Sequence, residues 1–101
     1  MTLQWSAYAI KTFQEASDYI ACNFYPDYAD AFDADVLETV EKLLDSPLLG
    51  KEAYPKINRP DLRKILCRNK NWWVYYRIID EAIEISQIVY ARQTNINPFG
   101  L

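Results

Sequence analysis

With 101 residues, half of them hydrophobic, the chain is long enough for one domain around a single core, so residues 1–101 are treated as one domain. It has no histidine and only two cysteines, which excludes Ser–His and Cys–His catalysis and leaves almost no ligands for zinc, so we expect no metal and no cofactor. The net charge of −3 argues against a dedicated nucleic-acid-binding protein, because phosphate contacts depend on accumulated positive charge.

The first 24 residues predict a short strand followed by an amphipathic helix. In "TLQWS", Leu3 and Trp5 share one face of the strand. Ser6 is a good N-cap, because its hydroxyl oxygen can accept hydrogen bonds from the first amides of a helix. The expected buried stripe of this helix recurs at three- and four-residue spacing and consists of Ile10, Phe13, Ser17, Ile20 and Phe24.

A second helix follows a short break, so the two helices are expected to form a helical hairpin. Pro26 disfavours helical geometry at Tyr25 and therefore ends the first helix within "YPDYAD". The second helix should stop near Ser46–Pro47, and most of its acidic residues lie away from its apolar stripe. That stripe consists of Phe32, Val36, Val40 and Leu43.

Residues 47–61, "PLLGKEAYPKINRPD", are predicted to form a loop, because they carry three prolines and a glycine. Three strands are predicted next, "LRKILCR", "WWVYYRII" and "AIEISQIVYAR", the last two joined tightly at Asp80–Glu81. The order strand, helix, helix, strand, strand, strand predicts an α+β domain. The helical hairpin packs on one face of a mostly antiparallel sheet.

Period-two alternation divides the last two strands between an inner and an outer face. Arg77 cannot sit beneath the helices without a large desolvation cost, so its face should be the outer one. The predicted inner set is Trp72, Val74, Tyr76, Ile78, Ile83, Ile85 and Val89. The predicted outer set includes Trp73, Tyr75, Arg77, Ile79, Glu84, Ser86, Ile88, Tyr90 and Arg92.

The outer set contains an aromatic and basic patch that neither helix is expected to cover, made of Trp73, Tyr75, Arg77, Tyr90 and Arg92. Exposed aromatic patches usually mark partner sites, so we predict a protein-binding face here. The alternative is that the C-terminal tail, residues 93–101 with the sequence "QTNINPFGL", folds back and covers it. Both can hold in part.

Charge is unevenly distributed along the chain. Residues 1–50 carry two lysines and nine acids, a net charge of −7. Residues 51–77 carry eight basic and two acidic residues, a net charge of +6, and residues 78–101 carry −2. An acidic half and a basic middle indicate a bipolar surface, with a solvated sheet opposite solvated helices as the plainer interpretation.

The compartment follows from what the chain lacks. No apolar run approaches the ~18 residues of a membrane span. The start, "MTLQWSAYAIKTF", has neither the basic region nor the apolar stretch of a signal peptide. We therefore predict a cytoplasmic protein with no membrane partner. Cys22 and Cys67 are expected to be free, buried thiols, with a disulfide between them as the alternative.

In the order and spacing of its segments the chain resembles the RelE/ParE superfamily of small bacterial toxins from toxin–antitoxin (plasmid stabilisation) systems. The resemblance spans residues about 3 to 93. After a strand and two helices it rests on "PLLG" at 47–50, "LRKIL" at 62–66, "VYYRI" at 74–78 and "IVYAR" at 88–92. It implies the fold derived above. It also implies a cognate antitoxin as partner, with a homodimer or a toxin–antitoxin hetero-oligomer as the assembly.

Two activities recur in the superfamily. RelE-like members cleave mRNA inside the ribosome, with clustered lysines and arginines and often a C-terminal tyrosine to stabilise phosphoryl transfer. ParE-like members poison DNA gyrase and are not nucleases. The RelE-like pattern expects an arginine just before "VYY", where this chain has Trp73, and no tyrosine follows Arg92. The resemblance therefore favours a gyrase inhibitor that is not an enzyme. The alternatives are a ribosome-dependent endoribonuclease and a homologue that only binds its antitoxin.

Several individual residues carry their own alternatives. Arg63 and Arg92 match superfamily positions and are the candidates for catalysis if the protein is an enzyme. Arg63 could instead form a surface ion pair with an acid of the second helix. Tyr76 is predicted to belong to the core, and Pro47 and Gly50 to shape the loop after the second helix. The predicted antitoxin- or target-binding set is Trp73, Tyr75, Arg77, Tyr90, Arg92, Arg63 and Lys64.

Overall fold

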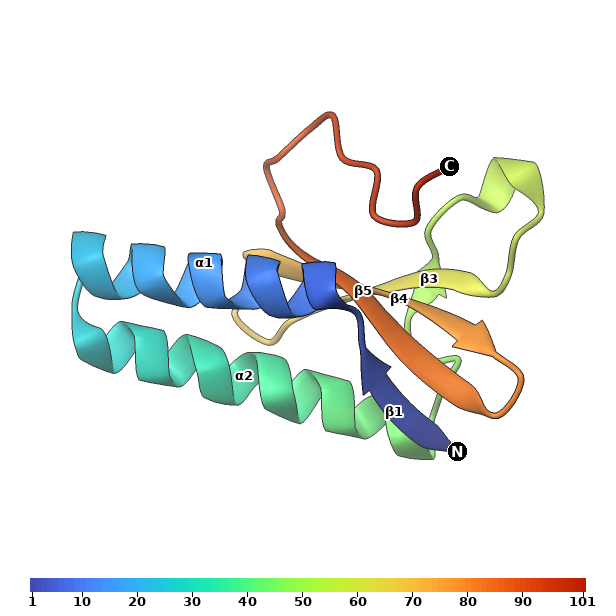
Figure 1. Ribbon diagram of the computed structural model, residues 1–101, viewed down its shortest axis with the longest axis horizontal. Coiled ribbons are helices and arrows are strands. Elements are labelled where there is room, and N and C mark those ends of the chain that lie inside the picture. Colours follow the sequence, from blue (N-terminus) through green and yellow to red (C-terminus); the bar gives the residue numbers. More distant parts are fainter.

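The computed structural model describes residues 1–101 as two α-helices, five strands and one short 3-10 helix (Figure 1). The elements in chain order are β1 (Thr2–Trp5), α1 (Ala7–Asn23), α2 (Pro26–Asp45), β2 (Lys51–Glu52), η1 (Pro55–Ile57), β3 (Leu62–Leu66), β4 (Trp72–Ile79) and β5 (Ala82–Tyr90). The predicted order is confirmed. Two small elements, β2 and η1, lie within residues 47–61, which the sequence predicted to be only a loop.

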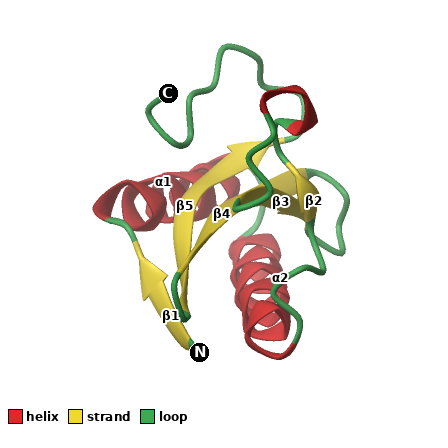
Figure 2. Ribbon diagram, turned by 90° about the vertical axis from the view of Figure 1, so that its right-hand side faces the viewer, coloured by secondary structure: helices red, strands yellow, loops and turns green.

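The strands form one sheet in the order β1-β5-β4-β3-β2. All neighbouring strands are antiparallel except β1, which pairs in parallel with β5. The two helices form a hairpin that lies on one side of the sheet, and the C-terminal tail lies on the other side (Figure 2). The predicted α+β architecture with a mostly antiparallel sheet is therefore confirmed.

The helix ends are set by the residues that the sequence indicated. The Ala9 amide donates a hydrogen bond to the Ser6 hydroxyl at 3.0 Å, which caps α1. Tyr25 is extended and Pro26 opens α2, where its missing N–H costs nothing. α2 ends at Asp45, one residue before the predicted stop.

The stripe of α2 was predicted correctly, whereas that of α1 was partly wrong. Phe32, Val36, Val40 and Leu43 are all buried. In α1, Phe13 and Ile20 pack against the core, but Ile10 is 45% exposed and Phe24 is 58% exposed. Ala9 and Ala16 are buried in their place, because these small side chains let the helix approach the sheet closely. Both residues are too small to stand out as core in a hydrophobicity pattern.

A β-bulge in β5 reverses the predicted faces at the end of that strand. Tyr75 pairs with Gln87 and Tyr76 with Ile85, so Ser86 is an extra residue opposite β4. Two hydroxyls of the α1 region satisfy the interrupted backbone, because the Ser6 hydroxyl donates to the Ser86 carbonyl at 3.2 Å and the Ile88 amide donates to Thr12 Oγ1 at 3.1 Å.

The bulge has a clear consequence for side-chain direction. Before it, Ile83 and Ile85 point to the helices as predicted. After it, Ile88 joins the core cluster, and Tyr90 lies opposite Trp72 of the inner face. Val89, predicted to be inner, lies opposite Trp73 of the outer face. The predicted faces of Ile88, Val89 and Tyr90 were therefore wrong, because one inserted residue inverts the period-two alternation, although Val89 is buried as predicted.

Candidate functional site

The loop after α2 is fixed to β4 by the hydroxyl of Tyr76, which is fully buried. This hydroxyl donates to the Pro47 carbonyl at 2.7 Å and accepts a hydrogen bond from the Gly50 amide at 3.0 Å. Burial raises the pKa of Tyr76, although the Gly50 hydrogen bond and the nearby Arg63 oppose the shift. Tyr76 thus belongs to the core, as predicted, and the "PLLG" segment owes its shape to it.

Arg63 is also used to hold this loop. Its guanidinium donates to the Gly50 carbonyl at 3.2 and 2.7 Å and to the Pro60 carbonyl at 3.0 Å. No acid of α2 pairs with it, so the ion pair that was the alternative for Arg63 is not formed. The side chain lies on the inner edge of the sheet and does not join the aromatic residues of the outer face, since Arg63 pairs in register with Tyr76.

The outer face brings together Trp73 and Lys64, two members of the predicted binding set. The Lys64 ammonium lies 4.6 Å from the centroid of the Trp73 ring, and the Lys51 ammonium lies 5.1 Å from the same ring. Both distances are within the range of a cation–π interaction. The pKa of Lys64 is lowered, first by burial and then by repulsion from Lys51. Lys51 was not among the predicted residues, because it lies in β2, a strand that the sequence did not reveal.

The C-terminal tail covers the adjoining part of the outer face. Phe99 packs edge-on against Tyr75 and Tyr54, with ring centroids 6.0 Å apart in each pair. Tyr75 is consequently buried, and so is Pro98. The alternative interpretation of the tail therefore holds at Tyr75, whereas Trp73 stays half-exposed.

Arg77 lies on the outer face but is paired, and Arg92 lies beyond the sheet. Arg77 donates from Nε to Glu84 Oε1 at 2.9 Å, so its charge is already neutralised by its neighbour across β5. Arg92 is exposed just beyond the end of β5. The predicted binding set is thus distributed over several places in the fold, and only Trp73, Tyr75, Arg77 and Lys64 share the outer face.

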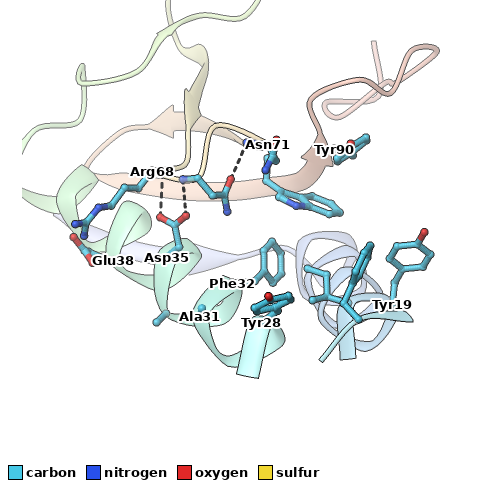
Figure 3. Close-up of a pocket in the computed structure, with 14 residues that line it drawn as sticks. Tyr19, Tyr28, Ala31, Phe32, Asp35, Glu38, Arg68, Asn71 and Tyr90 are labelled. Atoms are coloured by element: carbon cyan, nitrogen blue, oxygen red, sulfur yellow. Dashed lines mark hydrogen bonds between the residues drawn. The ribbon is translucent and has the colours of Figure 1, made fainter. Parts of the chain in front are cut away.

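An aromatic groove lies on the other side of the sheet, where the ends of α1 and α2 meet β4 and β5 (Figure 3). Trp72 lines it, and its ring lies 5.1 Å from the Phe32 ring and 5.3 Å from the Tyr90 ring between centroids. Tyr19 of α1 and Tyr28 of α2 line its helical side, and each side chain is more than half exposed. The groove has a volume of about 1130 Å³.

The polar end of the groove is held by Asp35. Asp35 of α2 accepts hydrogen bonds from the amides of Arg68 and Asn69 at 3.0 and 2.9 Å, which ties the β3–β4 turn to the helix. Sequence reasoning missed this groove, because it is built from four separate elements and depends on the bulge that turns Tyr90 inward. The available signal was the pair Tyr19 and Tyr28, two aromatic residues outside the apolar stripes of their helices.

Comparison with known proteins extends the fold assignment. A chain of a solved structure titled "Chromosomal ParDE TA system from P. aeruginosa" matches with a TM-score of 0.74 and 20% sequence identity, over 89% of this chain and 95% of that chain. The chain therefore shares its fold with that structure. The family model described as the ParE toxin of the type II toxin-antitoxin system, parDE, matches residues 3–94, so the chain belongs to the ParE toxin family.

The family assignment confirms the resemblance that the sequence motifs indicated. No curated protein sequence matches this chain. None of its helices combines the length and the apolar character needed to cross a bilayer.

Proposed function

We propose that the chain is the toxin of a type II toxin–antitoxin pair, that it inhibits DNA gyrase, and that a cognate antitoxin neutralises it. The observation that carries the proposal is the match of the ParE toxin family to residues 3–94. Gyrase inhibition is the activity that the sequence resemblance implies for ParE-like members, and a toxin of this type of system is encoded with an antitoxin.

The state of the basic residues supports gyrase rather than messenger RNA as the target. A ribosome-dependent nuclease needs cationic groups free to meet the phosphate whose charge increases in the transition state. The Arg63 guanidinium is instead engaged by the Gly50 and Pro60 carbonyls. Trp73 stands where the RelE-like pattern expects an arginine. Of the two arginines that match superfamily positions, only Arg92 is exposed and free of such bonds, and a single arginine is a poor substitute for a cluster.

The antitoxin is the proposed occupant of the aromatic groove and of the exposed part of the outer face. Large exposed aromatic surfaces gain most from burial by a partner, and Tyr19, Tyr28 and Tyr90 provide such a surface. Trp72 and Trp73 are consecutive in β4 and serve opposite faces. An antitoxin that contacts both indoles must therefore wrap around the β3–β4 turn.

A supercoiling assay tests the function directly. Purified protein is incubated with gyrase, ATP and relaxed plasmid, and loss of supercoiling is expected, with recovery when the co-encoded antitoxin is added. Arg92→Ala should weaken the inhibition, because Arg92 is an exposed cation at the end of β5. Lys11→Ala, which removes an exposed cation of α1, is the matched control and should inhibit as the wild type does.

The competing activity has its own assay. The protein is added to ribosomes stalled with a defined codon in the A site, and no cleavage of the mRNA is expected. Specific cleavage that disappears in Arg92→Ala, together with unimpaired gyrase, would overturn the proposal in favour of a ribosome-dependent nuclease.

A further inference from the structure

Two lysines and one tryptophan on the outer face form a cluster whose charge nothing in the chain neutralises. Lys51 of β2 and Lys64 of β3 are direct partners in the antiparallel register, where like charges repel. Both ammonium groups lie over the Trp73 ring, at 5.1 and 4.6 Å from its centroid. The three ion pairs of the structure are elsewhere, at Lys42–Glu38, Arg59–Asp61 and Arg77–Glu84.

We infer that Lys51, Lys64 and Trp73 form a carboxylate-binding site that takes an aspartate or glutamate side chain from an extended acidic segment of a protein partner. A carboxylate between the two ammonium groups removes their mutual repulsion and forms charge-assisted hydrogen bonds with both. The indole beneath gives the methylene groups of the same side chain an apolar surface. The pKa of Lys64 is lowered by burial and by repulsion from Lys51, and an anion between the two ammonium groups would oppose both effects.

The form of the sheet edge fits an extended segment. β2 pairs only with Arg63 and Lys64, and the Ala53 amide donates to the Leu62 carbonyl at 2.8 Å, so the part of the outer edge of β3 that meets no further strand is Ile65–Leu66. An extended chain placed along this edge can continue the sheet and present alternate side chains to the outer face. One of those side chains then reaches the two lysines, which come from the two strands at this edge.

The charge of the whole protein favours a carboxylate over nucleic-acid phosphate as the anion. Nucleic-acid binding requires many phosphate contacts, whereas this cluster offers two cations on a protein of net charge −3. Tail residue Phe99 lies next to the cluster on Tyr75, which limits the site to a narrow segment. That the segment belongs to the antitoxin rests on the proposed function; the chemistry of the site does not.

The test uses a blocked octapeptide of alternating glutamate and leucine, titrated into the ¹⁵N-labelled protein. The indole N–H signal of Trp73, assigned with Trp73→Phe, should shift in a saturable manner. The same peptide with glutamine in place of glutamate should leave it unchanged. Lys51→Gln/Lys64→Gln should weaken peptide binding at least tenfold and Lys51→Arg/Lys64→Arg should retain it. Lys11→Gln/Lys42→Gln, which removes the same charge elsewhere, should bind as the wild type does.

Three outcomes would overturn the inference. The first is equal binding of the glutamate peptide by the wild type and Lys51→Gln/Lys64→Gln. The second is equal binding of the glutamine peptide. The third is a twelve-base-pair DNA duplex that binds through these lysines when the glutamate peptide does not. Thermal unfolding of each variant checks that the fold persists, and it should, because the lysines are exposed or half-exposed and repel each other.

The outcome can be separated from the toxin proposal. A protein that inhibits gyrase but binds no acidic peptide at the lysines keeps its proposed function and loses this site. A protein that binds the peptide through Lys51 and Lys64 but has no effect on gyrase keeps the site and loses the proposed function.

Discussion

Gly50→Ala is expected to be among the most destabilising single-methyl additions in this chain. A Cβ at this position would lie 2.6 Å from the Tyr76 hydroxyl oxygen, 2.6 Å from the Lys64 carbonyl oxygen and 2.9 Å from the Tyr76 ring. The φ angle of Gly50 is outside the left-handed region, so alanine is excluded by the lack of space and not by the backbone conformation. To relieve this clash, the loop that carries residue 50 must move away from the fully buried Tyr76.

The magnitude follows from what that movement breaks. Overpacking of a core costs about 1–3 kcal/mol. Loss of partners for a buried polar group costs a further ~1–3 kcal/mol, and the loop motion breaks the Gly50 N–H to Tyr76 hydroxyl bond of 3.0 Å. Because the loop relaxes in part, we expect a total of about 2–4 kcal/mol, measured as the change in the free energy of unfolding in urea.

A double-mutant cycle with Tyr76→Phe identifies the cause. Phenylalanine removes the hydroxyl that the new methyl would strike, although the contact with the Lys64 carbonyl remains. Gly50→Ala should therefore cost less in the Tyr76→Phe background, with a coupling energy of about 0.5 kcal/mol or more. A cost under ~1 kcal/mol in the wild-type background, or strict additivity of the two changes, would refute the reasoning that Tyr76 determines the glycine.

Three other changes test the core, the outer face and the thiols. Phe13→Ala should destabilise the protein by about 2–4 kcal/mol in chemical denaturation, because its half-buried ring packs on Trp5 and Phe32; a loss under ~1 kcal/mol would contradict the helical packing. Trp73→Ala should weaken the antitoxin complex by at least ~2 kcal/mol in calorimetric titration and leave the fold intact, whereas unchanged affinity would remove the outer face from the interface. Cys22 should react with a thiol reagent in the native protein and Cys67 should not, because Cys67 is buried; two reactive thiols before unfolding would contradict the structure. Burial raises the pKa of Cys67 from 9.0 to about 11. Between these two pH values the thiol keeps its proton in the folded state and loses it in the unfolded state. The contribution of Cys67 to stability is therefore complete below pH 9.0 and is lost as the pH rises to about 11. Cys67→Ala should abolish this loss when the free energy of unfolding is measured against pH.

Much of the fold was predictable because local signals agreed with the tertiary structure. Residues 72–79 were predicted as a strand with the bounds that the structure gives β4, since turn residues enclose an alternating aromatic run. The prediction that both cysteines are buried held for Cys67 and was wrong for Cys22, which is exposed near the end of α1. The stripe predicted for α1 ran one position away from the buried Ala9 and Ala16, and Cys22 lies outside the buried face of the helix.

The bulge at Ser86 could not be read from the sequence, because its cause lies far away along the chain. Its backbone is satisfied by Ser6 and Thr12, which are separated from their partners on β5 by 80 and 76 residues. A period-two pattern contains no information about such partners. The outer-face residues of β4 were therefore placed correctly. Tyr90, which follows the bulge in β5, was assigned to the wrong surface.

The bulge also limits how positions in β5 can be compared between related chains. Deletion of Ser86 would leave every side chain beyond it on its present side, because each would keep its partner on β4. If Ser86 stayed and the strand paired regularly with β4, every side chain beyond that point would change sides. The tyrosine would leave the helices for the opposite surface, and the adjacent valine would take its place over Trp72. An alignment that places a one-residue gap anywhere else in this strand would therefore equate residues on opposite surfaces of the molecule. For relatives as divergent as 20% identity, the surface that a tyrosine of this strand occupies follows from the presence of the extra residue, and not from the tyrosine itself.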